Sequence, residues 1–172
     1  MRKLILCGAF VIAAAFSGQA QAIPENAIGI RLSAGDGIGA DVSYQRRVFT
    51  NNRLEFDLGI REQDWYDTAK FVAAFHWVFP IEQGFAFYAG PGIGAGHWKF
   101  DRYNDPDNDW DDDGAFGVVT GVAGIEYKFA KIPLQLSFDI RPEVHFGDDR
   151  GDFDRDHNDF VPDIGLAVRY TF

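Results

Sequence analysis

Aspartates that recur at every second position give this sequence its most evident capacity for chemistry. They are Asp105, Asp107, Asp109, Asp111 and Asp113. Carboxylates at this spacing are typical of loops that bind Ca²⁺, because a hard cation takes several oxygen ligands. An EF-hand loop counted from Asp105 would need glycine at its sixth position and glutamate at its twelfth, where this chain has Trp110 and Phe116. The stretch is therefore a candidate calcium site, and a solvated acidic loop is the alternative.

Histidines and serines are the residues that could support nucleophilic catalysis. Such a site needs a histidine beside a serine, with a carboxylate to orient the imidazole ring. After position 22 the histidines are His76, His97, His145 and His157, and the serines are Ser33, Ser43 and Ser137. No histidine has a serine within three residues, and His145, two residues after Glu143, is the best placed. We therefore predict no catalytic residues, and an enzyme stays open as an alternative.

The first residues have the pattern of a secretory signal peptide. Met1-Arg2-Lys3 is a basic start, an apolar run follows, and Ala20-Gln21-Ala22 fits the small-x-small cleavage motif. We expect residues 1–22 to be removed and residues 23–172 to form one domain. The single cysteine, Cys7, lies in the segment that is removed, so we expect no disulfide in the mature chain.

The charge of the chain is strongly acidic and concentrated in two stretches. There are 26 acidic and 16 basic residues, and losing Arg2 and Lys3 with the signal shifts the net charge from −10 to −12. Residues 101–114 hold seven aspartates and one arginine, and residues 147–159 hold six aspartates and two arginines, so together they carry −10. This charge argues against nucleic acid as a partner, because phosphate backbones are bound by basic residues.

Eight segments of alternating apolar and polar residues lie between these features. They span residues 27–33, 38–46, 54–61, 70–79, 85–100, 116–129, 134–144 and 160–172. A period of two predicts β-strands with one apolar face. The connections after the second, fourth and sixth segments are short, whereas 101–114 and 147–159 leave the opposite side. Short turns at one end and longer loops at the other are typical of a transmembrane barrel.

The two faces of the expected strands differ in composition. One carries Phe, Tyr, Leu and Ile, and its aromatic residues gather towards the short turns. The other carries glycine, small residues and charges of both signs: Arg31, Asp41, Glu55, Asp57, Arg61, Glu126, Lys128, Asp139, Arg141, Glu143, Asp163 and Arg169. A lipocalin-like soluble barrel would turn the apolar face inward, but an eight-stranded interior is too narrow for so many large side chains. We predict that the charged face points inward, with the glycines at 90–96 making room for long side chains.

The chain ends on Tyr170-Thr171-Phe172, an aromatic-x-Phe ending that completes the apolar face of the last strand. With the signal peptide, the alternation and the loop asymmetry, this ending resembles the small outer-membrane barrels of the OmpA-transmembrane and OmpX type. The resemblance covers all of residues 23–172. It implies an all-β, eight-stranded antiparallel up-and-down transmembrane β-barrel in the outer membrane of a Gram-negative bacterium, with periplasmic termini. It also implies contact with membrane lipid and lipopolysaccharide, and with the barrel assembly machinery during biogenesis.

From these features we expect a non-enzymatic integral outer-membrane protein with a plugged polar lumen. Its acidic extracellular loops would give it a structural or surface-interaction role. No cofactor is expected, apart from possible Ca²⁺ at the aspartates. Two alternatives remain: a lipid A-modifying enzyme, as some eight-stranded barrels are, and a narrow pore.

Overall fold

The fold was examined in a computed structural model, which describes residues 23–35, 37–62, 66–100, 113–147 and 159–172. The expected signal peptide and most of the two acidic stretches lie outside these ranges. Within them, no helix combines the length and the apolar character needed to cross a membrane.

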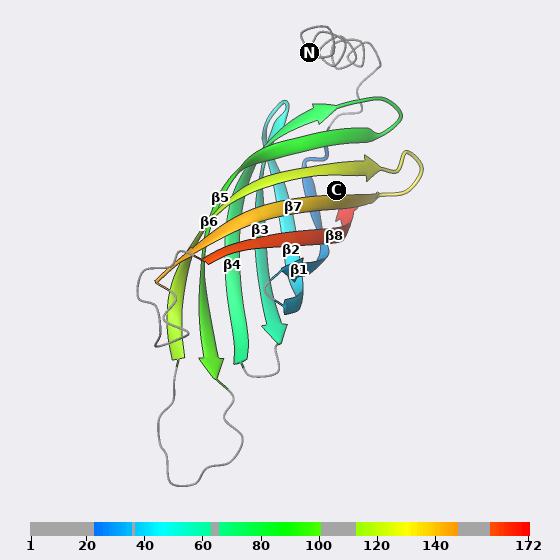
Figure 1. The fold of residues 1–172 in the computed structure, drawn as a ribbon. Coiled ribbons are helices and arrows are strands. Elements are labelled where there is room, and N and C mark those ends of the chain that lie inside the picture. Colours follow the sequence, from blue (N-terminus) through cyan, green and yellow to red (C-terminus); the bar gives the residue numbers. More distant parts are fainter. Residues whose placement is uncertain (1–22, 36, 63–65, 101–112, 148–158) are drawn as a thin grey trace, which may run out of the picture.

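Eight antiparallel strands form a closed barrel in which each strand pairs with its neighbours in the sequence (Figure 1). The strands are β1 (Asn26–Gly35), β2 (Gly37–Phe49), β3 (Asn52–Glu62), β4 (Tyr66–Pro80), β5 (Phe85–Phe100), β6 (Asp113–Lys128), β7 (Leu134–Phe146) and β8 (Asp159–Thr171). This arrangement confirms the predicted up-and-down barrel. Most strands extend beyond the predicted segments, because backbone pairing continues past the residues that alternate in polarity.

The barrel is closed by its first and last strands. β1 pairs with β8 from Ala27 opposite Thr171 to Ala34 opposite Ile164. Beyond this ladder, the backbone nitrogens of Asn26 and Phe172 each donate to the other's carbonyl oxygen, over 2.9 and 3.0 Å. The final residue therefore takes part in closure, at the end of the barrel where the short turns between β2 and β3, β4 and β5, and β6 and β7 also lie.

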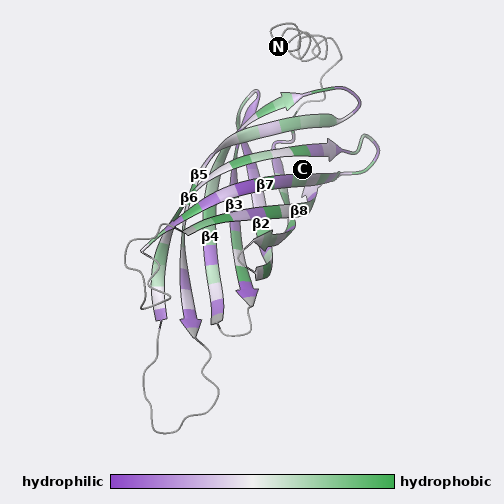
Figure 2. Ribbon diagram, in the orientation of Figure 1, coloured by the Kyte–Doolittle hydropathy of each residue, from purple (hydrophilic) through white to green (hydrophobic). Residues whose placement is uncertain are grey.

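Buried and exposed residues alternate along β7, and Figure 2 shows bands of hydrophilic and hydrophobic residues along the strands. Leu136, Phe138 and Ile140 are 41–48% exposed, whereas Asp139 and Arg141 are almost fully buried. An apolar exterior around a charged interior is the reverse of a soluble barrel. The predicted orientation of the faces is confirmed: every charged residue expected inside is buried except Lys128, which is half-buried at the end of β6.

Three prolines on the outer face interrupt the ladder of hydrogen bonds at one level of the wall. Pro91 pairs with Gly121, and Pro142 pairs with Pro162. Between Ala89 and Gly92, β5 is not paired with β4, and Pro91 lies in this gap. Proline has no backbone N–H to donate, and placing it outward limits the loss to these positions.

Glycines on the inner face make room for large side chains, and the predicted stretch at 90–96 supplies only part of them. The space above Gly96 is filled by the ring of Phe116, which a Cβ atom there would approach to 2.3 Å. The guanidinium of Arg31 lies instead over Gly165 of β8, at 2.3 Å from such a Cβ position. The expected space at residues 90–96 is thus present at Gly96, where a ring of β6 occupies it, whereas Arg31 lies over a glycine of β8 because the stagger of the strands decides which glycine faces which side chain.

The orientation of the wall predicts the effect of a charge on its outer face. Replacing Phe138 by arginine should lower the free energy of unfolding in lipid by roughly 2–4 kcal/mol near the midplane, because lipid cannot solvate the guanidinium. Denaturant unfolding of the refolded barrel in vesicles measures this loss. Phe138→Leu is the matched control and should cost far less; equal stabilities for the two variants would contradict a lipid-facing Phe138.

Candidate functional site

The lumen is the part of the described structure in which polar side chains converge. Its buried charges are the basic residues Arg31, Arg53, Arg61, Lys70, Arg141 and Arg169 and the acidic residues Asp41, Glu55, Asp57, Glu126, Asp139, Glu143 and Asp163. Among the described residues the six positive charges thus face seven negative ones. Such charges are tolerated in an interior only when they are paired and hydrogen-bonded.

Arg31 gathers three carboxylates from three different strands. Its Nη2 atom lies 2.6 Å from Asp139 of β7, and its Nη1 atom lies 3.0 Å from Asp163 of β8 and 3.2 Å from Asp41 of β2. Arg61 of β3 extends the group, with Nη2 at 3.5 Å from the same oxygen of Asp163. This cluster joins the two strands that close the barrel to their neighbours.

Arg141 connects β7 with the opposite wall. Its Nη1 and Nη2 atoms lie 2.6 Å from Asp57 and from Glu55 of β3, and its Nε atom lies 3.0 Å from Asp139. Arg169 of β8 also reaches Glu55, at 3.1 Å. The prediction that Arg141 and Arg169 point inward and pair with carboxylates is confirmed, and these side chains span the lumen.

Arg53 was missed by the sequence analysis, and two glutamines join it in the lumen. Arg53 lies one residue before the predicted start of its strand; its Nη2 atom is 2.6 Å from Glu126, and its Cζ atom is 4.8 Å from the centre of the Tyr88 ring. The amide of Gln135 donates to Glu126 over 2.7 Å, and that of Gln45 donates to Glu55. The alternation of the strand could have identified Arg53 as an inward residue, since it is two positions from Glu55 and so shares its face.

Lys70 of β4 is a second basic residue that the sequence analysis missed. It belongs to the group of charged lumen residues nearest the long connections. Its Nζ atom lies 2.6 Å from Glu143 of β7. His145 lies 3.1 Å from the same carboxylate oxygen and stacks on Phe116, with ring centres 4.9 Å apart. The pairing of His145 with Glu143 that the sequence suggested is therefore present, but both residues are about 1% exposed.

The three serines that could have served a catalytic histidine contact arginines instead. Ser33 accepts a hydrogen bond from Arg61 over 3.0 Å. Ser43 and Ser137 accept from Arg169 over 2.9 and 2.7 Å. In this arrangement the serine oxygens help to hold the arginines in place. The remaining candidates differ in position: His76 is buried in the lumen, His97 is exposed, and His157 lies outside the described residues.

The proposed calcium ligands fall almost entirely outside the described residues. Asp105, Asp107, Asp109 and Asp111 belong to that part of the chain. Asp113, the first residue of β6, is exposed, and its carboxylate lies 2.9 Å from Nε2 of His97. In the described ranges no three acidic, histidine or cysteine residues are grouped so that they could hold a metal ion. The calcium site thus stays a prediction.

The central ion pairs predict a large cost for removing a single partner. Arg141→Ala should lower the free energy of unfolding by about 3–5 kcal/mol, because Asp57 and Glu55 would lose a buried counter-charge. Arg46→Ala is the control: Arg46 is half-exposed and pairs with Glu25 at 3.3 Å, so its loss should cost less than about 1 kcal/mol. Denaturant unfolding of both refolded variants measures the difference, and similar losses would mean that the lumen pairs are solvated.

Comparison with known proteins gives a likeness in structure. No protein-family model and no curated protein matches the sequence. The N-terminal β-barrel domain of Pseudomonas aeruginosa OprF is 15% identical over 88% of this chain and all of that one, with a TM-score of 0.57. Neisserial surface protein A (NspA) is 13% identical over 86% of this chain and 94% of its own, with a TM-score of 0.60.

Ail, the attachment invasion locus protein of Yersinia pestis, is 18% identical over 86% of this chain and 96% of its own, with a TM-score of 0.53. Sequence identities this low establish a shared fold rather than a shared activity. Taken with the closed barrel, its apolar exterior and its charged lumen, they show that this chain has the fold of the small eight-stranded outer-membrane β-barrels.

Proposed function

We propose that this protein is a non-enzymatic, integral outer-membrane protein of a Gram-negative envelope, with a plugged lumen and a structural or surface-interaction role. The observation that carries the proposal is the division between the two sides of the wall. Large apolar side chains are exposed outside, whereas the described interior holds a nearly balanced set of paired charges. Termini and short turns face the periplasm, and the long acidic connections face the outside of the cell.

Contact with membrane lipid and lipopolysaccharide is supported by the exterior. Aromatic residues gather near the short turns, among them Trp77, Phe79, Phe85 and Phe87, each 46–54% exposed. Such side chains suit the boundary between hydrocarbon and headgroups. Phe172, which is 61% exposed beside Tyr170, supplies the terminal aromatic that the assembly machinery would recognise.

The plugged lumen is supported by the geometry of the arginines. Arg31, Arg141 and Arg169 reach carboxylates that belong to other parts of the wall, and each is at most 1% exposed. The serines occupy hydrogen-bond positions on Arg61 and Arg169, which supports a structural rather than a catalytic role for them. A conducting or catalytic lumen would need space that these side chains fill.

A surface-interaction role is supported by where the charge is placed in the sequence. Residues 101–112 and 148–158 connect β5 with β6 and β7 with β8, and they hold most of the net negative charge. Two structural neighbours are named as a surface protein and as an attachment invasion locus protein. We extend only the idea of surface interaction from them, with a cationic partner as the chemistry that the aspartates favour.

The proposal is tested by exchanging both acidic connections for Gly-Ser linkers of equal length in the full chain. Both proteins should fractionate with the outer membrane and show heat-modifiable electrophoretic mobility, because the barrel is unchanged. Binding of a cationic probe such as polylysine to intact cells should fall at least several-fold in the exchanged protein. Recovery of the parent protein as a soluble periplasmic species would overturn the location, and equal binding would overturn the role of the connections.

The aspartates make a separate prediction for calcium. Titrating Ca²⁺ into the refolded barrel should release heat that is lost when Asp105, Asp107 and Asp109 are changed to asparagine, because the neutral amides remove the charge of the ligands. A matched control changes Asp148, Asp149 and Asp152 to asparagine, which removes equal charge from the other connection. Equal heats in all three proteins, or none in any, would leave the aspartates as solvated surface.

A further inference from the structure

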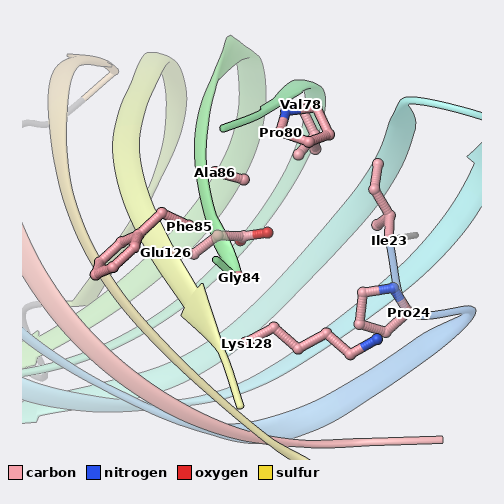
Figure 3. Close-up of a pocket in the computed structure, with 9 residues that line it drawn as sticks. All are labelled: Ile23, Pro24, Val78, Pro80, Gly84, Phe85, Ala86, Glu126 and Lys128. Carbon is pink, nitrogen blue, oxygen red and sulfur yellow. The ribbon is translucent and has the colours of Figure 1, made fainter. Parts of the chain in front are cut away.

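The short-turn end of the lumen differs from its centre, because part of its lining is apolar. The buried residues of this lining come from β4, β5 and β6 and include Ala74, Val78, Ala86, Tyr88 and Val122. Ile23 joins this cluster and is only 6% exposed, although it precedes the first strand. Figure 3 shows its side chain apart from Val78 and Ala86, across the pocket that these three residues help to line.

Arg47 of β2 connects the segment that carries Ile23 to the barrel wall. It donates from Nη1 to the carbonyl oxygen of Ile23 over 3.0 Å. Its backbone nitrogen donates to the carbonyl oxygen of Glu25 over 2.9 Å. Glu25 also pairs with Arg46 at the exposed surface. β1, which begins three residues after Ile23, pairs with β2 and β8, so Ile23 clusters with strands that β1 does not pair with.

A pocket lies next to this segment and runs towards the charged centre. Its lining includes Ile23, Pro24, Phe85 and Lys128, and also Glu126, the buried partner of Arg53 (Figure 3). Water entering past Ile23 would reach both the apolar cluster and the Arg53–Glu126 pair. Wetting either is unfavourable, since the cluster would lose its burial and the ion pair its low-dielectric surroundings.

From this arrangement we propose that residues 23–25 are a built-in plug that closes the short-turn end of the lumen, with Ile23 as the seal and Arg47 as the anchor. The inference rests on the plugged lumen proposed above and deepens it: ion pairs close the centre of the barrel, and the chain's own N-terminal segment closes this end. Because residues 23–25 precede β1, the plug can open without breaking the β1 ladder.

Accessibility of a single cysteine tests the plug. Residues 23–172 contain no cysteine, so Ala86→Cys in a barrel that begins at Ile23 places its only thiol in the cluster that includes Ile23. A charged, water-soluble methanethiosulfonate should modify it slowly in the refolded barrel in micelles. Adding Ile23→Gly should raise the rate at least about tenfold, because burying an isoleucine side chain is worth more than a factor of ten in an equilibrium constant.

Matched variants separate the plug from general loosening. Arg47→Ala should give a smaller rise, since it removes the side-chain bond to the Ile23 carbonyl, and Glu25→Gln should leave the rate unchanged. Heat-modifiable mobility shows whether each barrel is folded; if Ile23→Gly is not, Ile23→Ala replaces it and should still raise the rate several-fold. Equal rates with and without Ile23, or fast modification in its presence, would overturn the plug. The test is done in micelles, so its result does not depend on where the protein lies in the cell. The proposed function requires an outer-membrane location, whereas the plug does not, so the two proposals can fail separately.

Discussion

The structure depends on the fact that hydrocarbon offers no hydrogen-bond partner. Every backbone group in the wall must then find its partner in a neighbouring strand, which requires the sheet to close on itself. The reciprocal bonds between Asn26 and Phe172 extend that closure to the last residue. The same condition disfavours charges on the lipid-facing side of the wall, and the narrow interior then requires the inward charges to meet partners of opposite sign. The ion pairs around Arg31 and Arg141 follow from the closed wall.

The architecture could be predicted because its cause is local. A residue's face follows from whether its position is odd or even along the strand, so Arg141 and Phe138 could be assigned to opposite sides from the sequence alone. The partners of each arginine could not be predicted in this way. They depend on the tilt and stagger of strands far apart in the chain, which set the height of each side chain in the lumen. The sequence therefore predicted that Arg31 points inward, but it did not predict that its guanidinium lies over Gly165.

β4 shows where alternation gives a weaker signal. Its sequence is apolar on both faces, because Val72, Ala74 and Val78 point inward while Phe71 and Trp77 point outward. Two of these inward residues, Ala74 and Val78, share a buried apolar cluster with Ile23, which belongs to no strand and which no periodicity identifies. The acidic connections show another limit of prediction from sequence. Their repeated aspartates indicate that a cation could bind, but the spacing alone does not give the arrangement of ligands around it.

The ion pairs of the lumen also bear on how the barrel can form. Arg31 of β1 is separated by 108 positions from Asp139 and by 132 from Asp163. An early hairpin of β1 and β2 has Asp41 for this arginine, but the other two carboxylates arrive only with the last two strands. A partly formed sheet would therefore expose uncompensated charge if it entered the bilayer by itself. Entry of an incomplete chain into lipid would then be unfavourable, because Arg31 would lack two of its three carboxylate partners.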